Sequence, residues 1–383
     1  MSLGYEIDLR ALRSGYDGET CWVHARGGAI PGGGRDGRPA VIVTMQKLLL
    51  SGSDVFYTIN DLRSDDLGES WVGPTPHEAL ARWPEEGGIE AAVCDFTPKW
   101  HAASGTLLGT GHTVRYAGDA GPLHVRRREV AYATCDAAAR SWSAPRFLEL
   151  PDEPCFRNAG AGSGQRCDLE DGTVLLPIYF RPTIDEAMYR VTVLRCSFDG
   201  SELRYLGRGN ELSAPDPRGM CEPSLTHCGG RFFLTLRNDV RGYVAASDNG
   251  LQFGAPVPWR FDDGSVLGNY NTQQHWLRHS EALHLVYTRR GADNDHVFRH
   301  RAPLFVAEVD PERLCVVRAS ECIAVPERGA RLGNFGVCEV SAQESWITAA
   351  EWMQPAGCEA YGSDNTIWCA RVRWERPHEG WLP

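Results

Sequence analysis

The stretch RSDDLGESW, Arg63 to Trp71, decides the fold, because it places Ser64, Asp66, Gly68 and Trp71 at relative positions 1, 3, 5 and 8. Serine and aspartate side chains accept hydrogen bonds from backbone N–H groups a few residues further on, which closes a tight turn. Glycine adopts the left-handed backbone angles of such a turn, and a large aromatic side chain suits the start of the next strand. The stretch predicts a hairpin turn stabilised by its own side chains.

Weaker versions of this pattern recur along the chain, at TCDAAARSW (134–142), SFDGSEL (197–203), ASDNGLQF (246–253, with Asp248 and Gly250) and AEVDPERL (307–314). With a last strand near Cys369, the units start near 64, 134, 197, 246, 307 and 369, in steps of 70, 63, 49, 61 and 62 residues. A period near sixty, filled by about four short strands, is typical of one β-propeller blade. We therefore predict an all-β fold, a six-bladed propeller of four-stranded antiparallel blades, with residues 1–383 as a single domain.

The composition agrees with an all-β protein. Hydrophobic residues make up 42% of the 383 residues, and Gly (41) and Pro (23) are abundant. Short apolar runs such as AVIVTM and TVLLPIYF are broken by Gly, Asp, Asn and Pro, as in strands joined by turns. The best helical candidate is the run TPHEALARW, residues 75–83.

Charge and cysteine content exclude several classes of protein. The net charge is −11, with Lys and Arg dispersed, which argues against a nucleic-acid partner. The sequence contains no run of 18 apolar residues, so we expect no membrane-spanning helix. The start of the sequence lacks the apolar core of a secretory signal, so we expect a cytoplasmic protein, or a secreted one if a leader has been removed. The thirteen cysteines include no C-x-x-C pair, which predicts buried free thiols and no zinc site.

The Ser-x-Asp-x-Gly-x-x-Trp pattern resembles the Asp-box of the sialidase (neuraminidase) superfamily, whose fold is a six-bladed propeller. Residues 158–180 resemble the family's glycine-rich strand pair in the third blade. Residues 221–239 resemble its segment with a glutamate followed fifteen residues later by an arginine. The resemblance runs from about residue 20 to 355, and it implies a glycoside hydrolase that acts on a terminal acidic sugar without a cofactor.

Three arginines of the family bind the substrate carboxylate, because a planar guanidinium pairs with both carboxylate oxygens. The resemblance assigns these roles to Arg26 in HARGGAIPG, Arg237 in LTLRND and Arg301 in RHRAPLFVAEVD. Arg299 is a rival for the place of Arg301.

The resemblance also assigns the carboxylates. Glu222 takes the place of the glutamate that polarises the family's nucleophile, and Glu351 in TAAEWM resembles the glutamate that braces the first arginine. Asp54 in SGSDVF lies ten residues before the first box, near the family's general acid, and Asp36 and Asp61 compete with it for this role.

The sequence departs from the family at the nucleophile, which is a tyrosine shortly before the bracing glutamate. Phe335 takes this place in the stretch 333–353, and phenylalanine has no oxygen with which to form a glycosyl–enzyme bond. Three alternatives follow: another tyrosine serves, with Tyr270 in GNYNTQQHW as our candidate; the enzyme is inverting; or a different reaction is catalysed.

Histidines lie near several predicted inner strands, namely His24, His101, His112, His275 and His296. A convergent group of them would suit proton transfer in a hydrolase or lyase that acts on a uronic acid. Their spacing is not that of a metal site. The sequence thus leaves three hypotheses: a sialidase-like hydrolase, a uronate-directed lyase or hydrolase that uses histidine and tyrosine, and a non-catalytic propeller that binds carbohydrate.

Overall fold

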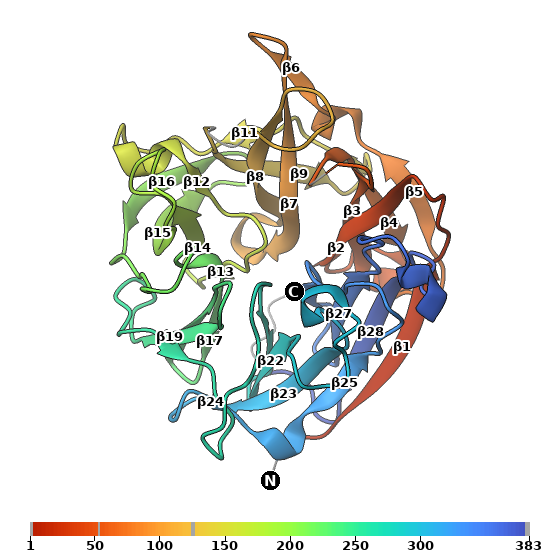
Figure 1. Cartoon of the computed structure of the whole chain (residues 1–383), viewed down its shortest axis with the longest axis vertical. Coiled ribbons are helices and arrows are strands. Elements are labelled where there is room, and N and C mark those ends of the chain that lie inside the picture. The colour runs from red at the N-terminus through yellow and green to blue at the C-terminus, as the bar shows by residue number, and fades with distance from the viewer. Residues whose placement is uncertain (1–2, 53, 124–126, 380–383) are drawn as a thin grey trace.

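Six antiparallel sheets surround a central axis in the computed structural model, which describes residues 3–52, 54–123 and 127–379 (Figure 1). Short strands alternate with turns along the whole chain, as the apolar runs and turn residues predicted. The predicted all-β, six-bladed propeller with four-stranded blades is confirmed.

Blades 1 to 5 are each built from consecutive strands, and blade 6 adds a strand from the start of the chain. Blade 1 holds β2 (Thr20–Ile30), β3 (Ala40–Leu49), β4 (Phe56–Ser64) and β5 (Val72–Pro76), and blade 2 holds β6 (Trp83–Glu85), β7 (Ile89–His101), β8 (Thr106–Tyr116), β9 (Val130–Asp136), β10 (Ser141–Trp142) and β11 (Arg146–Phe147). In blade 2 the strand next to the central axis is β7, and β6 lies at the periphery (Figure 1). Blade 3 holds β12 (Ala159–Gly160), β13 (Cys167–Asp168), β14 (Thr173–Phe180), β15 (Arg190–Phe198) and β16 (Leu203–Arg208).

The second half of the ring follows the same plan. Blade 4 holds β17 (Cys221–Cys228), β18 (Arg231–Arg237), β19 (Tyr243–Ser247) and β20 (Val257–Pro258), and blade 5 holds β21 (His275–Arg278), β22 (Leu283–Tyr287), β23 (Leu304–Asp310), β24 (Cys315–Val316) and β25 (Cys322–Val325). Blade 6 holds β26 (Gly336–Glu339), β27 (Glu344–Ala350), β28 (Ile367–Trp374) and β1 (Tyr5–Arg13).

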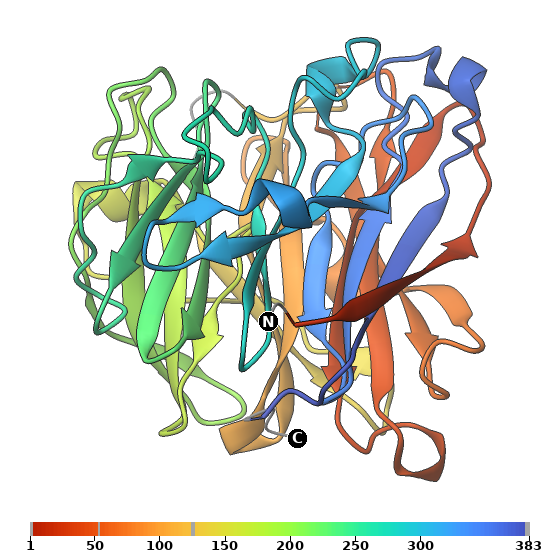
Figure 2. The same cartoon turned by 90° about the horizontal axis from the view of Figure 1, so that it is seen from below.

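Blade 6 closes the ring, because its outer strand β1 comes from the start of the chain. β1 pairs antiparallel with β28, from Tyr5 opposite Trp374 to Arg13 opposite Ile367. Figure 2 shows this red strand lying beside the blue strands of the chain's last hundred residues. Leu3, Val372 and Trp374 belong to one buried cluster that also includes residues of blade 5.

In the part of the chain that the structure describes, helical structure is limited to 3-10 turns: η1 (Arg35–Gly37), η2 (Glu78–Leu80), η3 (Ala102–Ser104), η4 (Pro154–Arg157), η5 (Phe298–His300), η6 (Arg318–Ser320) and η7 (Cys358–Tyr361). The predicted helix at 75–83 is wrong. Thr75 and Pro76 pair with β4 instead, which leaves only the three residues of η2 to turn. No helix of the described part of the chain is long and apolar enough to cross a membrane.

The turn that opened the sequence argument joins β4 to β5 and is stabilised as predicted. Ser64 Oγ accepts the Gly68 N–H at 2.8 Å and donates to Asp66 Oδ1 at 2.9 Å, and Asp66 Oδ1 accepts the Ser70 N–H at 2.9 Å. The Trp71 ring lies 6.1 Å from the ring of Trp346 in blade 6. The turn therefore packs one blade against the next.

Matching turns follow β9, β15, β19 and β23 in blades 2 to 5. In each, one side-chain oxygen accepts the N–H groups two and three residues further on; the acceptors are Asp136, Asp199, Asn249 and Asp310. The sequence motif placed the blade 4 acid at Asp248, but that residue is exposed and Asn249 makes the turn.

All thirteen cysteines lie among the described residues and are free, as predicted, and ten of them are buried. Most contribute to apolar clusters between neighbouring blades, such as Cys21 and Cys94 between blades 1 and 2.

Candidate active site

Each of the six blades has one non-glycine residue with a positive φ in its inner strand or in the chain beside that strand, at the same end of the propeller. These residues are His24 (58°), Asp95 (55°), Ser163 (55°), Glu222 (47°), Asn271 (55°) and Asn334 (64°), and we refer to them as the hub ring. Strand pairing skips at the kinks of β2, β7 and β17. Bulges of this kind redirect side chains, and strained backbone of this kind concentrates at functional sites.

Two predicted arginines converge on one member of the hub ring. Arg237, the last residue of β18, donates to Asn271 Oδ1 at 2.9 Å. Arg301 follows η5 and donates both to the Asn271 carbonyl oxygen and to Oδ1, at 3.2 Å for the latter. Both guanidinium groups are buried. A single oxygen between blades 4, 5 and 6 thus accepts N–H groups from two charged side chains.

Of these two arginines, Arg237 has a carboxylate partner and Arg301 is bonded to the uncharged Asn271. Burial opposes the charge of Arg237, but the ion pair with the Glu222 carboxylate outweighs it and raises the pKa of the guanidinium. Burial, together with the nearby charges of Arg237 and Arg331, lowers the pKa of Arg301 well below its ordinary value. The site therefore has surplus positive charge at Arg301.

Arg26, the third predicted arginine, is held elsewhere in the hub ring. Its fully buried guanidinium donates to Asp95 Oδ1 at 3.1 Å and to Ser163 Oγ at 2.8 Å. Arg331 lies close enough to Arg301 to act on its charge, and its guanidinium carbon lies 4.1 Å from the ring centroid of Trp352. Burial lowers the pKa of Arg331 to about 10.

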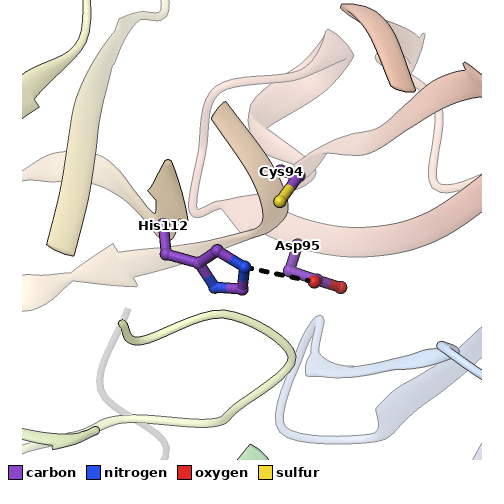
Figure 3. Close-up of side chains that lie close together, drawn as sticks. All are labelled: Cys94, Asp95 and His112. Atoms are coloured by element: carbon purple, nitrogen blue, oxygen red, sulfur yellow. Dashed lines mark ion pairs between the residues drawn. The ribbon is translucent and has the colours of Figure 1, made fainter. Parts of the chain in front are cut away.

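Asp95 is a site residue that the sequence did not reveal. Besides Arg26, it lies near two histidines, with His24 Nε2 at 3.4 Å and His112 Nε2 at 3.7 Å. Figure 3 shows the contact with His112. Burial acts to raise the pKa of Asp95, but the attraction of His24, Arg26 and His112 outweighs it and holds the pKa well below its usual range. Asp95 is thus a carboxylate whose charge is fixed by three cationic or protonatable groups.

Glu351 does not brace Arg26, so this part of the prediction is corrected. Its Oε2 accepts the backbone N–H groups of Asp364 and Thr366, each at 3.0 Å, and its Oε1 accepts Trp368 Nε1 at 3.1 Å. The guanidinium nearest to it is Arg328, at 3.5 Å. Glu351 therefore orders the chain that leads into β28.

Asp54 is exposed in the loop between β3 and β4, at the end of the propeller that holds the arginines. Its carboxylate acts electrostatically on Arg331, Arg299 and His24. The rivals lie elsewhere: Asp61 is buried between blades 1 and 2, 2.8 Å from His77 Nε2, and Asp36 lies in η1 at the other end of β3. Asp54 is the one of the three that faces the arginine cluster.

Tyr270 directly precedes Asn271, and its hydroxyl lies 2.6 Å from His300 Nδ1. His300 Nε2 lies in turn 3.1 Å from Asp295 Oδ1, and the Arg290 guanidinium stacks on the phenol ring at 4.0 Å. A hydroxyl next to a base that is oriented by a third group is the general arrangement of an activated nucleophile.

Phe335 lies in the core and not in the hub ring. Its side chain is fully buried against His275, and its carbonyl oxygen accepts His275 Nε2 at 3.1 Å. The neighbouring Asn334 faces the site instead, 3.1 Å from His24 Nε2. Blade 6 therefore presents an amide to the centre at this position.

The histidines converge only in part. His24 and His112 meet at Asp95, and His275 is buried below the hub ring, 2.7 Å from Ser224 Oγ. His101 caps η3 at the other end of β7, and His296 pairs with Glu327 on the surface.

One group of side chains among the described residues resembles a metal site. Ligand atoms of Cys94, Asp95 and His112 lie within 4.8 Å of one another (Figure 3). The Arg26 guanidinium, 3.1 Å from Asp95 Oδ1, opposes a second cation at this carboxylate.

Comparisons with known proteins support the fold. No protein-family model matches the chain, and no curated protein matches it. Solved structures do match: a Dyadobacter fermentans protein of unknown function has a TM-score of 0.66 at 13% identity, and the match covers 96% of this chain and 99% of that one.

Two sialidases are similar at the same level. Trypanosoma rangeli sialidase matches with a TM-score of 0.62 and 12% identity over 97% of this chain and 60% of its own. A Streptococcus pneumoniae sialidase matches with a TM-score of 0.64 and 11% identity over 95% and 70%. The chain thus spans about 60% of the Trypanosoma protein's length. Together with the six blades, these likenesses define the fold as a sialidase-like β-propeller.

Proposed function

We propose that this protein is a glycoside hydrolase that removes a terminal acidic sugar, sialic acid or a related one, whose carboxylate binds between Arg237 and Arg301. The observation that carries the proposal is that both guanidinium groups donate to Asn271 Oδ1, at 2.9 and 3.2 Å. A substrate carboxylate oxygen at this point would receive the same two charge-assisted hydrogen bonds.

The electrostatics of the pocket favour an anion. Arg301 is buried and bonded only to uncharged oxygens of Asn271 among the described residues, and Arg331 and Arg299 add further positive charge. A bound carboxylate would relieve the repulsion that lowers the pKa of Arg301. The similar Trypanosoma rangeli sialidase has been solved in complex with sialic acid, which supports a sugar as the ligand.

We assign the catalytic roles from the same geometry. Tyr270 attacks the anomeric carbon through its hydroxyl oxygen while the phenol proton passes to His300 Nδ1, 2.6 Å away. Asp54 donates a proton to the departing glycosidic oxygen as the bond to the anomeric carbon breaks. In the second step a water molecule displaces the Tyr270 phenolate at that carbon, Asp54 accepts the proton of the water, and His300 returns its proton to the phenolate oxygen.

Glu222 and Asp95 serve as positioning residues. Glu222 fixes the direction of Arg237 through the buried ion pair, and its Oε2 has no hydrogen-bond partner in the described part of the chain. Asp95 holds Arg26 and the two histidines on the opposite side of the hub ring. Their substitution is expected to affect substrate affinity through the arginines that they orient.

Hydrolysis of a fluorogenic sialoside tests the proposal. Arg237→Gln should lower kcat/KM by about 100-fold or more, because one charge-assisted donor is lost at the carboxylate. Arg278→Gln is the matched control, since Arg278 is also an arginine paired with a glutamate, Glu339 at 3.1 Å. These two residues line a cavity whose wall includes no hub-ring residue. Turnover that is equal in the wild type and Arg237→Gln would contradict the assignment.

A second candidate reaction is elimination from a uronic acid, and the two histidines at Asp95 favour it. His24 Nε2 and His112 Nε2 lie 3.4 and 3.7 Å from this carboxylate, so that one imidazole can take a proton while the other supplies one. Ultraviolet absorbance of a new unsaturated uronate, formed from a uronate oligosaccharide, would identify this reaction. Release of a reducing acidic sugar without such absorbance would identify hydrolysis.

A further inference from the structure

Two arginines outside the predicted set lie against one tyrosine on the wall of blade 3. The guanidinium carbon of Arg181, which follows β14, lies 4.7 Å from the ring centroid of Tyr189. That of Arg128, which precedes β9, lies 5.6 Å from Tyr189 and 4.9 Å from Tyr179. Cation–π contacts therefore hold both side chains in one place.

Neither guanidinium has a direct carboxylate partner among the described residues, and Asp95 acts on Arg128 only from a longer distance. The Nε atoms of both arginines, with Nη1 of Arg128, are buried without a hydrogen-bond partner in this part of the chain. Arg208 of the same blade shows the contrast: it stacks on Phe156 at 5.3 Å but pairs with Glu153 at 3.2 Å and Glu211 at 3.1 Å.

Burial acts to lower the pKa of Arg128, but Tyr179, Tyr189, Cys94 and Asp95 outweigh it and raise the pKa, so the side chain keeps its charge. A charged guanidinium without a direct anionic partner is suited to bind an anion from outside.

The backbone makes room for these side chains. A Cβ atom on Gly160 would lie 2.8 Å from Arg128 Cδ and 2.7 Å from His112 Cβ, so a larger residue there would displace Arg128. The Tyr189 N–H donates to the Arg218 carbonyl oxygen at 2.9 Å, and the Met220 N–H donates to the Tyr189 carbonyl oxygen at 2.9 Å. These bonds join the tyrosine to the segment that leads into Glu222.

Arg218 links the positive charge around Tyr189 to that around Arg237. Burial acts to raise the pKa of Tyr189, but Arg128, Arg181 and Arg218 outweigh it, so that the pKa of the phenol is lowered. Arg218 also acts on Glu222 and Arg237. Arg218 therefore acts electrostatically both on Tyr189 and on Arg237, which we assign to the substrate carboxylate.

We propose that Arg128 and Arg181, held on Tyr189, form a second oxyanion subsite that takes a sulfate ester or second carboxylate of the glycan whose first carboxylate binds Arg237 and Arg301. This inference rests on the proposed function for the identity of the first anion. It narrows the substrate to a sugar chain that carries two oxyanions.

Calorimetric titration with inorganic sulfate tests the subsite directly. The wild-type protein should bind two sulfate ions, and Arg128→Gln with Arg181→Gln should abolish one of them, whereas Arg237→Gln should abolish the other. Arg208→Gln, in which a stacked but paired arginine is changed, should retain both. A single sulfate that is lost only in Arg237→Gln would overturn the second subsite. A single sulfate that is lost only in the Arg128 and Arg181 variant would contradict the carboxylate site of the proposed function instead.

A spectroscopic titration of the wild-type protein gives a second readout that needs no arginine variant to fold. Sulfate at Arg128 and Arg181 would neutralise the charges that favour the phenolate, so the ionisation of one tyrosine should move to higher pH, and Tyr189→Phe should lack this shift. No sulfate-dependent change in tyrosine ionisation would overturn the proposal. The affinities for a sulfated and a carboxylated acidic disaccharide then identify the group that the subsite prefers. If a disaccharide with a single charge binds as tightly as these two, the second subsite is contradicted.

Discussion

Asn271 occupies the space between two guanidinium groups, and its amide oxygen is the neutral counterpart of a carboxylate oxygen. In Asn271→Asp, the new carboxylate should therefore bind Arg237 and Arg301 in the way that we propose for the substrate carboxylate. We expect the unfolding free energy to rise by about 1–2 kcal/mol, because charge-assisted hydrogen bonds replace neutral ones. Binding of acidic sugars should weaken more than about tenfold. Chemical denaturation and calorimetry measure the two effects, and a variant that is more stable but binds acidic sugars as before would show that the anion lies elsewhere.

His275 predicts how stability depends on pH. Burial, with a smaller contribution from Arg26, lowers its pKa to about 3 from the ordinary value of 6.5. Between pH 6.5 and about 3 the unfolded chain binds a proton that the native state does not, so stability falls as the pH is lowered through this range. The loss should reach about 2 kcal/mol at pH 5 for this residue alone. Urea denaturation at pH 7.5 and pH 5 measures it; His275→Gln should flatten the dependence and the surface variant His296→Gln should not. An unchanged slope in His275→Gln would contradict this assignment.

At the scale of the elements, the turn between β4 and β5 is a structural device at the end of the blades away from the arginines. Ser64→Ala removes the buried hydroxyl that accepts the Gly68 N–H at 2.8 Å. We expect a loss of about 1 kcal/mol in the unfolding free energy, because a half-buried donor loses its acceptor. Turnover of an acidic glycoside at a temperature where the variant is folded should not change. A variant that folds normally but has lost activity would give this turn a functional role.

The inner strands show what the sequence predicts and what it does not. The turn motif and its period predict six blades. The resemblance selects both Glu222 and Arg237, and the structure adds that they lie on one hairpin and form an ion pair. The partner of Arg26 is separated from it by 69 residues and comes from another blade. No local spacing encodes such a contact, and the positive φ of His24 and Asp95 redirects both side chains in a way that residue type alone does not indicate. Glu351 was misassigned because its partners, Asp364, Thr366 and Trp368, lie in the next strand, β28, or in the chain that leads into it. Asp248 was misassigned because the turn is made by the next residue, Asn249.

For the whole molecule, ring closure by β1 is the contact that makes six blades one structure. Its residues pair with β28 from Tyr5 to Arg13, and Ile7 and Leu9 pack against the buried cluster that includes blade 5. Deletion of residues 1–13 should lower the unfolding temperature by more than about 5 °C, because an edge strand and apolar surface are exposed. Differential scanning calorimetry measures the change. An unaltered unfolding temperature would mean that the other contacts of blade 6 suffice to close the ring.

The charge of the molecule limits how it captures an anion. The chain has a net charge of −11, so anionic sugars are repelled at long range, and the arginine pocket must act at short range. Binding should therefore strengthen only weakly when the ionic strength is reduced. Affinity that rises steeply at low salt would contradict a local pocket.

The most direct test of the central claim compares an acidic sugar with its methyl ester in calorimetric titrations of the wild-type protein. Sialic acid and glucuronic acid glycosides serve as the ligand pairs, since the ester keeps the sugar but removes the charge. We predict that at least one free acid binds more than about tenfold tighter than its ester, and that Arg301→Gln abolishes this preference. Equal affinity of each acid and its ester, or a preference that survives in Arg301→Gln, would contradict the account.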